Sequence, residues 1–151
     1  MKKYKYDIIM MAVLLTLVTN ITFSQSFEEI KKQIEETERS SEALVRLQVD
    51  AYNAKDLDKF LSVYSDSVRV IQYPGKIKYV GKVKMKEQYK KLFELNPKLH
   101  CEITNRIVFG NKIIDRERIT GYPDNWVYDA LVIYTFVDNK ISEVAFINQL
   151  D

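Results

Sequence analysis

The sequence contains one cysteine and one histidine in 151 residues. The single cysteine, Cys101, excludes an intramolecular disulfide. Its place in an apolar alternation favours a buried structural thiol over a nucleophile. A zinc site of the usual nitrogen- and sulfur-ligated type needs more of both residues. We therefore expect no metal and no cofactor.

The sequence also lacks a hydrophobic run long enough to span a membrane. Ile8 to Val18 is an apolar stretch of eleven residues, whereas a spanning helix needs about 20. Three lysines precede it and Thr22-Phe23-Ser24 follows it, a pattern typical of a secretory signal. We predict a signal peptide over residues 1–24, cleaved near Ser24, and an exported (periplasmic or secreted) domain over 25–151 with no stable membrane span. The alternative is an uncut N-terminal anchor.

The predicted mature chain also lacks a net charge. The formal charge of +2 comes from the predicted signal, because its three lysines and one aspartate leave 20 basic and 20 acidic residues in the mature chain. A balanced chain carries no electrostatic footprint for nucleic acid, so no nucleic-acid partner is expected. No repeat, linker or low-complexity tract divides the remaining 127 residues, which suffice for one domain with one core.

Three helices are predicted in the first two thirds of the chain. Ser26-Phe27-Glu28-Glu29 has the form of a capping box, and apolar residues recur at helical spacing as far as Ala51. A short break at 53–55 precedes Asp56, the predicted N-cap of a second helix. The third helix covers about 83–95 and ends at Asn96-Pro97.

The rest of the chain alternates with period two. A strand over about 67–73 ends at Pro74-Gly75, and a small strand is possible near 78–81. Turn residues then separate four longer strands, at about 99–109, 112–121, 126–137 and 141–149. Helices followed by a long meander predict an α+β fold, with three helices packed on a strongly curved antiparallel sheet.

Several polar residues fall on the predicted inner face of that sheet. Gln72 ends an apolar alternation, Asn105 interrupts another, and Asp115 and Glu117 lie between Ile113 and Ile119. Such groups form either a satisfied buried network or the lining of a small-molecule cavity. A buried carboxyl there can act as a general acid or base. Alternatively, Asp115 and Glu117 face solvent and pair with neighbouring basic residues.

Other candidate residues flank this group. His100 is either a candidate proton shuttle or a residue of the rim or surface. The strand at 126–137 carries Trp126, Tyr128 and Val132 on one face, aromatic at one end and small in the middle. We expect these three to bind ligand, together with Tyr52, Gln72 and Asn105.

Three segments resemble the SnoaL-like, steroid delta-isomerase-like branch of the NTF2-like superfamily. They are "LQVDAYNAKDLDKFLSVYSDSVRVIQYPG", "GKVKMKEQYKKLFELNPKLHCEI" and "NRIVFGNKIIDRERITG", within a resemblance that covers about Leu47 to Ile147. The resemblance implies a cone-shaped fold with a pocket at its wide end. The catalytic residues of the ketosteroid isomerases in this family are not present. Gln72 occupies the position that matches their Asp base, and their second catalytic carboxyl matches a position near Val132. Tyr52 is no secure counterpart of the oxyanion-hole tyrosine.

Two functional hypotheses remain. In the first, the domain binds a small hydrophobic molecule and Asp115 or Glu117 catalyses cofactor-free proton transfer of the isomerase, cyclase or dehydratase type, but not ketosteroid isomerisation by the usual residues. In the second, it is a non-catalytic ligand-binding or dimerising module. The apolar outer face of the meander, including Leu131 and Ile133, would then make a homodimer.

Overall fold

The computed structural model describes the backbone of residues 2–148 and the side chains of residues 25–147, Asp124 excepted. The side chains of the predicted signal segment and residue 149 of the last predicted strand lie outside this part. The chain divides into two compact units, residues 1–36 and residues 37–151. Within the described part, none of the helices is long and apolar enough to cross a membrane.

Helix α1 is continuous over Lys2–Ala54. The predicted start at Ser26 is therefore wrong. Neither glycine nor proline occurs before Pro74, so no strong helix breaker interrupts the chain there. In the first unit every described side chain is exposed, including Phe27, Ile30 and Ile34.

The part of α1 in the second unit buries one face. Ser41, Val45, Gln48 and Tyr52 are all buried and follow one another at spacings of three and four residues, which places them on one side of a helix. The predicted break is confirmed, because Lys55 adopts a left-handed conformation (φ 59°). Its ammonium group donates hydrogen bonds to the carbonyls of Tyr52 (3.2 Å), Asn53 (3.0 Å) and Leu99.

A side-chain clamp fastens the end of α1 to the sheet. Asn53 Nδ2 donates to the carbonyl of Cys101 (2.9 Å), and the Cys101 amide donates to Asn53 Oδ1 (2.7 Å). Two further helices follow, α2 (Leu57–Ser62) and α3 (Lys82–Leu95). Asp56 caps α2 as predicted, accepting a hydrogen bond from the amide of Lys59 (2.9 Å).

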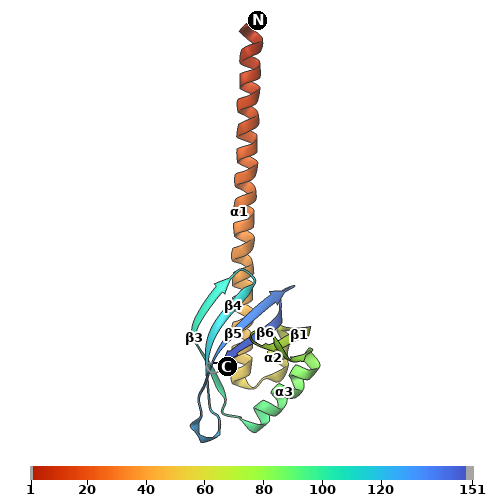
Figure 1. Ribbon diagram of the computed structural model, residues 1–151, viewed down its shortest axis with the longest axis vertical. Helices are drawn as coiled ribbons and strands as arrows, with labels where there is room; N and C mark the ends of the chain where they lie inside the picture. The colour runs from red at the N-terminus through yellow and green to blue at the C-terminus, as the bar shows by residue number, and fades with distance from the viewer. Residues whose placement is uncertain (1, 149–151) are drawn as a thin grey trace. The chain divides into compact units, whose positions relative to one another are not determined.

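Six strands form one sheet (Figure 1). They are β1 (Tyr64–Gln72), β2 (Lys76–Val80), β3 (His100–Phe109), β4 (Lys112–Thr120), β5 (Tyr128–Val137) and β6 (Lys140–Asn148). The order across the sheet is β2-β1-β6-β5-β4-β3. The α+β prediction is confirmed, with one difference. The β1–β6 pair is parallel, whereas the other pairs are antiparallel.

The hydrophobic core lies between this sheet and the helices of the second unit. Phe60, Met85 and Phe93 from α2 and α3 pack in one cluster with Val68 of β1 and Ile113 of β4. The inner face of the sheet continues this cluster toward the aromatic side chains described next.

Candidate functional site

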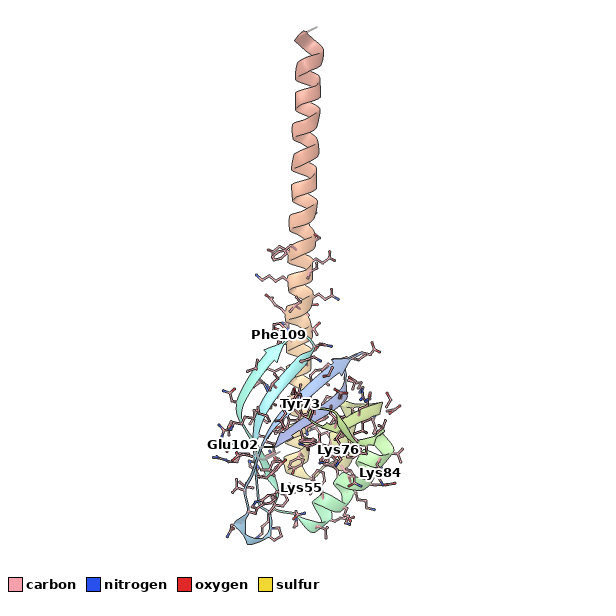
Figure 2. The ribbon with its side chains drawn as sticks, in the orientation of Figure 1. Lys55, Tyr73, Lys76, Lys84, Glu102 and Phe109 are labelled. Atoms are coloured by element: carbon pink, nitrogen blue, oxygen red, sulfur yellow. The ribbon has the colours of Figure 1, made fainter. Side chains whose placement is uncertain are left out.

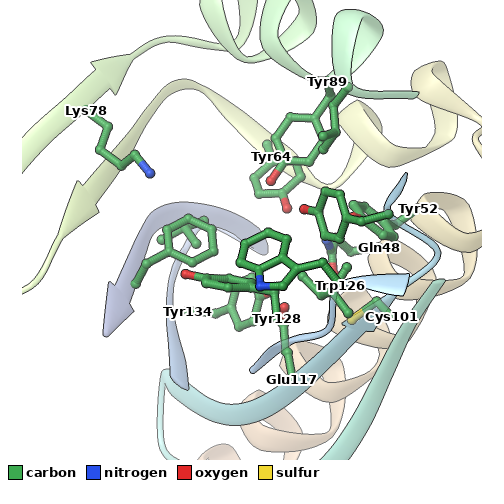
Figure 3. A pocket seen from close by; sticks show the side chains of 15 residues that line it. Gln48, Tyr52, Tyr64, Lys78, Tyr89, Cys101, Glu117, Trp126, Tyr128 and Tyr134 are labelled. Atoms are coloured by element: carbon green, nitrogen blue, oxygen red, sulfur yellow. The ribbon is translucent and has the colours of Figure 1, made fainter. Parts of the chain in front are cut away.

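A cavity of about 270 Å³ lies in the second unit, beside the core. Its walls are mainly aromatic (Figure 3). Six tyrosines line it: Tyr52, Tyr64, Tyr89, Tyr122, Tyr128 and Tyr134. Trp126 and Phe146 complete the aromatic lining. An aromatic chamber with few polar groups is the usual form of a small-molecule site.

The helices and β1 supply one wall. Tyr52 comes from the last turn of α1, Tyr64 begins β1 and Tyr89 lies on α3. These rings rest on core phenylalanines: the Tyr52 and Phe93 centroids are 5.3 Å apart, and those of Phe60 and Tyr89 are 4.3 Å apart. Contacts of this kind fix the rings, so this wall is preformed.

The β4–β5 connection supplies the opposite wall and the rim. Trp126 follows a short 3-10 turn (Pro123–Asn125) and packs between Tyr122 and Tyr128, with centroid separations of 5.1 and 5.6 Å. The Trp126 side chain remains 57% exposed. It therefore lies at the rim, where an entering molecule meets it first.

Glu117 is the carboxyl group of the cavity. It points inward from β4 and is only 5% exposed, and its Oε1 accepts a hydrogen bond from Tyr134 Oη at 2.6 Å. Burial raises the pKa of Glu117 from 4.5 to about 7, and the nearby charge of Asp115 adds to this rise. Hydrogen bonds from Tyr134 and Cys101, and the charge of Arg106, oppose it. Near neutral pH this carboxyl can therefore both accept and donate a proton.

The buried phenols remain protonated at neutral pH. Burial raises the pKa of Tyr64 and Tyr134 well above the ordinary value of 10.0, and the charge of Glu117 raises it further. Burial likewise raises the pKa of the Cys101 thiol. These hydroxyl groups are consequently hydrogen-bond donors, and Cys101 is a buried thiol as the sequence predicts.

Gln48 brings a polar group whose hydrogen bonding is incomplete. It is 6% exposed and lines the cavity from α1. A side-chain hydrogen bond links it to Tyr64, but its Oε1 atom has no hydrogen-bond partner among the described residues. Buried polar atoms are rarely left unpaired, so this atom requires an explanation.

Lys78 is the basic residue at the cavity. It lies on β2 where the pairing with β1 shifts, since Val70 pairs with Tyr79 and Ile71 with Ile77. Lys78 is thus the extra residue of a β-bulge, a feature that redirects a side chain. Its ammonium group lies 5.5 Å from the Phe146 ring centroid, and Figure 3 shows it apart from the tyrosine cluster.

Asp115 lies inside the protein but not in the cavity. Its side chain is fully buried, and Arg106 binds both its oxygens, at 2.7 Å from Nε and 2.6 Å from Nη2. Arg106 also lies 3.7 Å from Glu42 of α1. Asp115 and Glu117 therefore share the inner face of β4 but have different surroundings, and only Glu117 lines the cavity.

The inward position of Arg106 contradicts the predicted faces of β3. Ile103 pairs with Glu117 but Asn105 pairs with Arg116, so Thr104 is an extra residue. The bulge reverses the alternation beyond it. Arg106 turns inward, while Asn105 is exposed. The expected inward position of Asn105 is therefore wrong.

Three other candidates lie outside the cavity lining. Gln72 is half-buried beside Phe146, which does line the cavity. His100 is exposed at the start of β3, opposite Thr120. Val132 is fully buried in the core. Of the expected ligand-binding residues, Tyr52, Trp126 and Tyr128 are those that line the cavity.

The sequence interpretation missed Gln48, Tyr64, Lys78, Tyr89 and Tyr134 as cavity residues. A signal for Gln48 was present, because it lies four residues after Leu44 and four before Tyr52 on an apolar helix face. No comparable signal marks Lys78, since a bulge sets its direction. Among the described residues, no three histidine, cysteine or acidic side chains gather closely enough to hold a metal ion.

Comparison with known proteins agrees with this fold. Residues 45–144 match the family model described as a SnoaL-like domain. The chain belongs to the SnoaL-like family, within the NTF2-like superfamily. No curated protein matches it significantly.

Solved structures with the same fold include proteins of several descriptions. An uncharacterized cystatin-fold protein from Novosphingobium aromaticivorans is 27% identical, with a TM-score of 0.66 over 72% of this chain and 97% of that one. A candidate ketosteroid isomerase from Kribbella flavida is 16% identical (TM-score 0.63, 75% and 80% covered). A SnoaL-like candidate polyketide cyclase from Jannaschia is 20% identical (TM-score 0.61, 74% and 87% covered).

Proposed function

We propose that this domain binds a small, largely hydrophobic molecule in the aromatic cavity and that Glu117 catalyses a cofactor-free proton transfer on it. One observation carries the proposal: a carboxyl group, 5% exposed in the cavity wall, has a pKa near 7. A general acid or base is most effective when its pKa lies near the working pH.

The chemistry requires only this chain's own groups. The Glu117 carboxylate removes a proton from a carbon next to a carbonyl, and the electron pair of that bond passes to the carbonyl oxygen. The Tyr64 hydroxyl donates a hydrogen bond to the resulting oxyanion. If Glu117 returns the proton to another carbon, the result is an isomerisation. If the enolate attacks a second carbonyl of the same molecule, the result is a cyclisation, and Glu117 gives its proton to the new alkoxide. If the enolate expels a hydroxyl from the neighbouring carbon, the result is a dehydration, and that hydroxyl takes the proton of Glu117 and leaves as water.

The proposed base differs from that of ketosteroid isomerases in position. The sequence resemblance places their carboxylates at Gln72 and Val132, neither of which can accept a proton. Glu117 reaches the cavity from β4 instead. Asp115 has another role, because its two oxygens already bind Arg106. It holds Arg106 and positions β3 against β4.

The test begins with ligand identification. Small molecules that co-purify with the native protein are identified by mass spectrometry, and their proton exchange or turnover is then followed in D₂O. Glu117→Gln should lower the rate by about 10²-fold or more. Glu102→Gln is the matched control, because Glu102 is exposed on β3 (Figure 2). Undiminished turnover by Glu117→Gln would refute the proposed base.

A second candidate function, dimerisation, rests on the outer face of the sheet. Ile107 of β3 pairs with Ile114 of β4, and Ile114 pairs with Ile133 of β5. Leu131 lies on the same face of β5 and is 41% exposed. A continuous apolar row of this kind is typical of an interface, and we propose a homodimer through it.

Sedimentation velocity tests the dimer. Leu131→Glu should shift the protein from dimer to monomer, because a charge would be buried at the interface. Val83→Glu, on an exposed position of α3, is the control that should leave the mass unchanged. A wild-type protein that is monomeric at all concentrations would contradict the proposal.

We further propose export with cleavage near Ser24, on the strength of the lysines and the short apolar run at the N-terminus. The mass of the exported protein should then match a chain that begins at Gln25. A full-length chain retained with the membrane fraction would favour the uncut anchor instead.

A further inference from the structure

The charged residues that line the cavity differ in how their charges are met. Among the described lining residues, Glu117 and Lys78 are the two that carry a formal charge. Glu117 is almost fully buried and accepts a hydrogen bond from the Tyr134 hydroxyl at 2.6 Å. Lys78 is exposed, and Figure 3 shows its ammonium end directed toward the ring cluster, well away from Glu117. The cavity therefore has an acidic group inside and a basic group at its mouth.

The β-bulge in β2 turns Lys78 toward the cavity. The neighbouring residue Tyr79 pairs with Val70 and packs against the core. Successive side chains of a regular strand point to opposite faces, so regular pairing would direct Lys78 away from the core side. Because Lys78 has no pairing partner on β1, it leaves this alternation and lines the cavity instead. Bulges are frequent beside functional sites.

No acidic side chain of the described residues neutralises Lys78. Within that part of the chain, the Lys78 side chain takes part in no ion pair. The acidic residue of β1, Asp66, pairs with Lys82 at 2.9 Å, and that of β6, Glu143, pairs with Arg69 at 3.1 Å. The carboxylates of the neighbouring strands are thus already engaged, and the positive charge at the mouth is available to a ligand.

The contact of Lys78 with Phe146 holds the ammonium group beside an apolar wall. The ammonium nitrogen lies 5.5 Å from the centroid of the Phe146 ring, which itself lines the cavity. This separation is within the range of a cation–π interaction. Such a contact occupies one side of the ammonium group, which has three N–H donors. The donors turned away from the ring can bind an anionic group.

The cavity beside Lys78 suits a compact cyclic body. Tyr52 and Tyr89 form one wall, and Trp126 and Tyr128 the other (Figure 3). Aromatic faces of this kind pack well against rings. A cavity of about 150 Å³ binds benzene, so the volume of about 270 Å³ holds one or two rings.

We propose that the ligand of this cavity is an organic acid, whose ionised group binds Lys78 at the mouth and whose hydrophobic ring body lies between the aromatic walls. The inference rests on the proposed small-molecule cavity but not on turnover. Lysine acts as a point charge and lacks the planar fork of arginine, so it recognises the negative charge rather than the shape of the acidic group. A neutral molecule of the same shape fills the cavity but leaves Lys78 unpaired.

The probe pair is indane-2-carboxylate and indane-2-carboxamide, which share a two-ring body and differ in charge. Calorimetric titration at pH 6 measures the dissociation constants of both. At this pH the carboxylate is ionised. Glu117, with a pKa of about 7, is mostly protonated and repels it little.

The carboxylate should bind about fivefold more tightly than the carboxamide, because Lys78 is exposed and an exposed ion pair contributes modestly. This preference should shrink to less than about twofold when the ionic strength rises from 0.01 M to 1 M, since the Debye length falls from about 30 Å to about 3 Å. A preference that does not change with salt would contradict the charge contact.

Substitutions at Lys78 isolate its charge. Lys78→Met removes the charge and keeps an unbranched side chain, so the two probes should bind alike. Lys78→Arg should retain the preference for the carboxylate, and Lys78→Glu should reverse it. Lys76→Met is the matched control and should retain the preference, because Lys76 is exposed on the same strand but does not line the cavity (Figure 2). The salt dependence is measured on the wild type, so the inference remains testable even if a variant misfolds.

The outcomes distinguish this inference from the proposed function. Equal binding of the two probes by the wild type, or a preference retained by Lys78→Met, would overturn the organic acid as ligand but leave a small-molecule cavity. Binding of neither probe would also overturn it. Acid binding as described, together with undiminished turnover by Glu117→Gln, would support the ligand class and refute the proposed base.

Discussion

Replacing Glu117 by glutamine should change how the stability of the protein depends on pH. Below pH 4.5 the carboxyl is protonated in both the folded and the unfolded chain. Between pH 4.5 and about 7 the folded protein keeps the proton, because burial has raised the pKa, whereas the unfolded chain releases it. Unfolding then releases a proton, so the free energy of unfolding falls as pH rises. Above pH 7 both forms are ionised and this decline ends.

The magnitude follows from the interval between the two pKa values. The pKa rises from 4.5 to about 7, and each pH unit corresponds to about 1.4 kcal/mol. Glu117 should therefore destabilise the folded protein by about 3 kcal/mol at pH 8 relative to pH 4. Glutamine keeps an oxygen for the Tyr134 hydroxyl but carries no charge, so Glu117→Gln removes this pH-dependent term.

Urea unfolding of the wild type and of Glu117→Gln between pH 4 and pH 8 measures the effect. The difference in unfolding free energy should shift in favour of the variant by about 3 kcal/mol from low to high pH. Other carboxyl groups titrate in both proteins and cancel in this difference. Glu102→Gln, exposed on β3, should show no such shift. Parallel pH profiles for the wild type and Glu117→Gln would refute the raised pKa and, with it, the proposed acid–base role.

Substitutions at three further positions test the framework of the site by chemical denaturation. Asp115→Ala removes the bidentate partner of Arg106 and leaves it only the longer contact with Glu42 (3.7 Å), so we expect a loss of about 3 kcal/mol, and a loss below 1 kcal/mol would contradict the ion pair. Gly121→Ala should be strongly destabilising, because its φ is +87° and an added Cβ would lie 1.9 Å from a backbone carbonyl oxygen; unchanged stability would refute this close approach. Asn53→Ala removes both hydrogen bonds of the clamp, which should cost about 2 kcal/mol, whereas Asn53→Asp should retain the bond from the β3 amide and cost less.

The sequence alone predicts most of the architecture. Turn residues at Gly110-Asn111 and Asp138-Asn139 mark the long hairpins, and Ile113 and Ile119 identify the inner face of β4. If these two residues face inward, alternation places Glu117 inside as well, and this alternative, rather than the solvent-facing one, is the one observed. These features are local, and local patterns determine strand limits and faces.

The features that sequence analysis missed depend on contacts distant in sequence. The β3 bulge reverses the face of Asn105, and no turn residue marks it. The parallel pairing of β1 with β6 joins segments about 75 residues apart. The different surroundings of Asp115 and Glu117 depend on Arg106. Regular alternation along β3 places that residue on the outer face, so no sequence pattern indicated the ion pair. Gln48 is different, since its helical spacing from Tyr52 was visible and could have identified it.

The β3 bulge has a consequence for variation in chain length. Thr104 is the extra residue, and its hydroxyl donates to the carbonyl of Arg116 at 3.1 Å. Deleting Thr104 would restore regular pairing and leave Ile103 and Arg106 facing inward, whereas a deletion elsewhere in the strand would turn every later side chain to the opposite face. A related chain that lacks this residue would therefore keep its buried ion pair. Its alignment with this protein would be correct only with a one-residue gap at position 104.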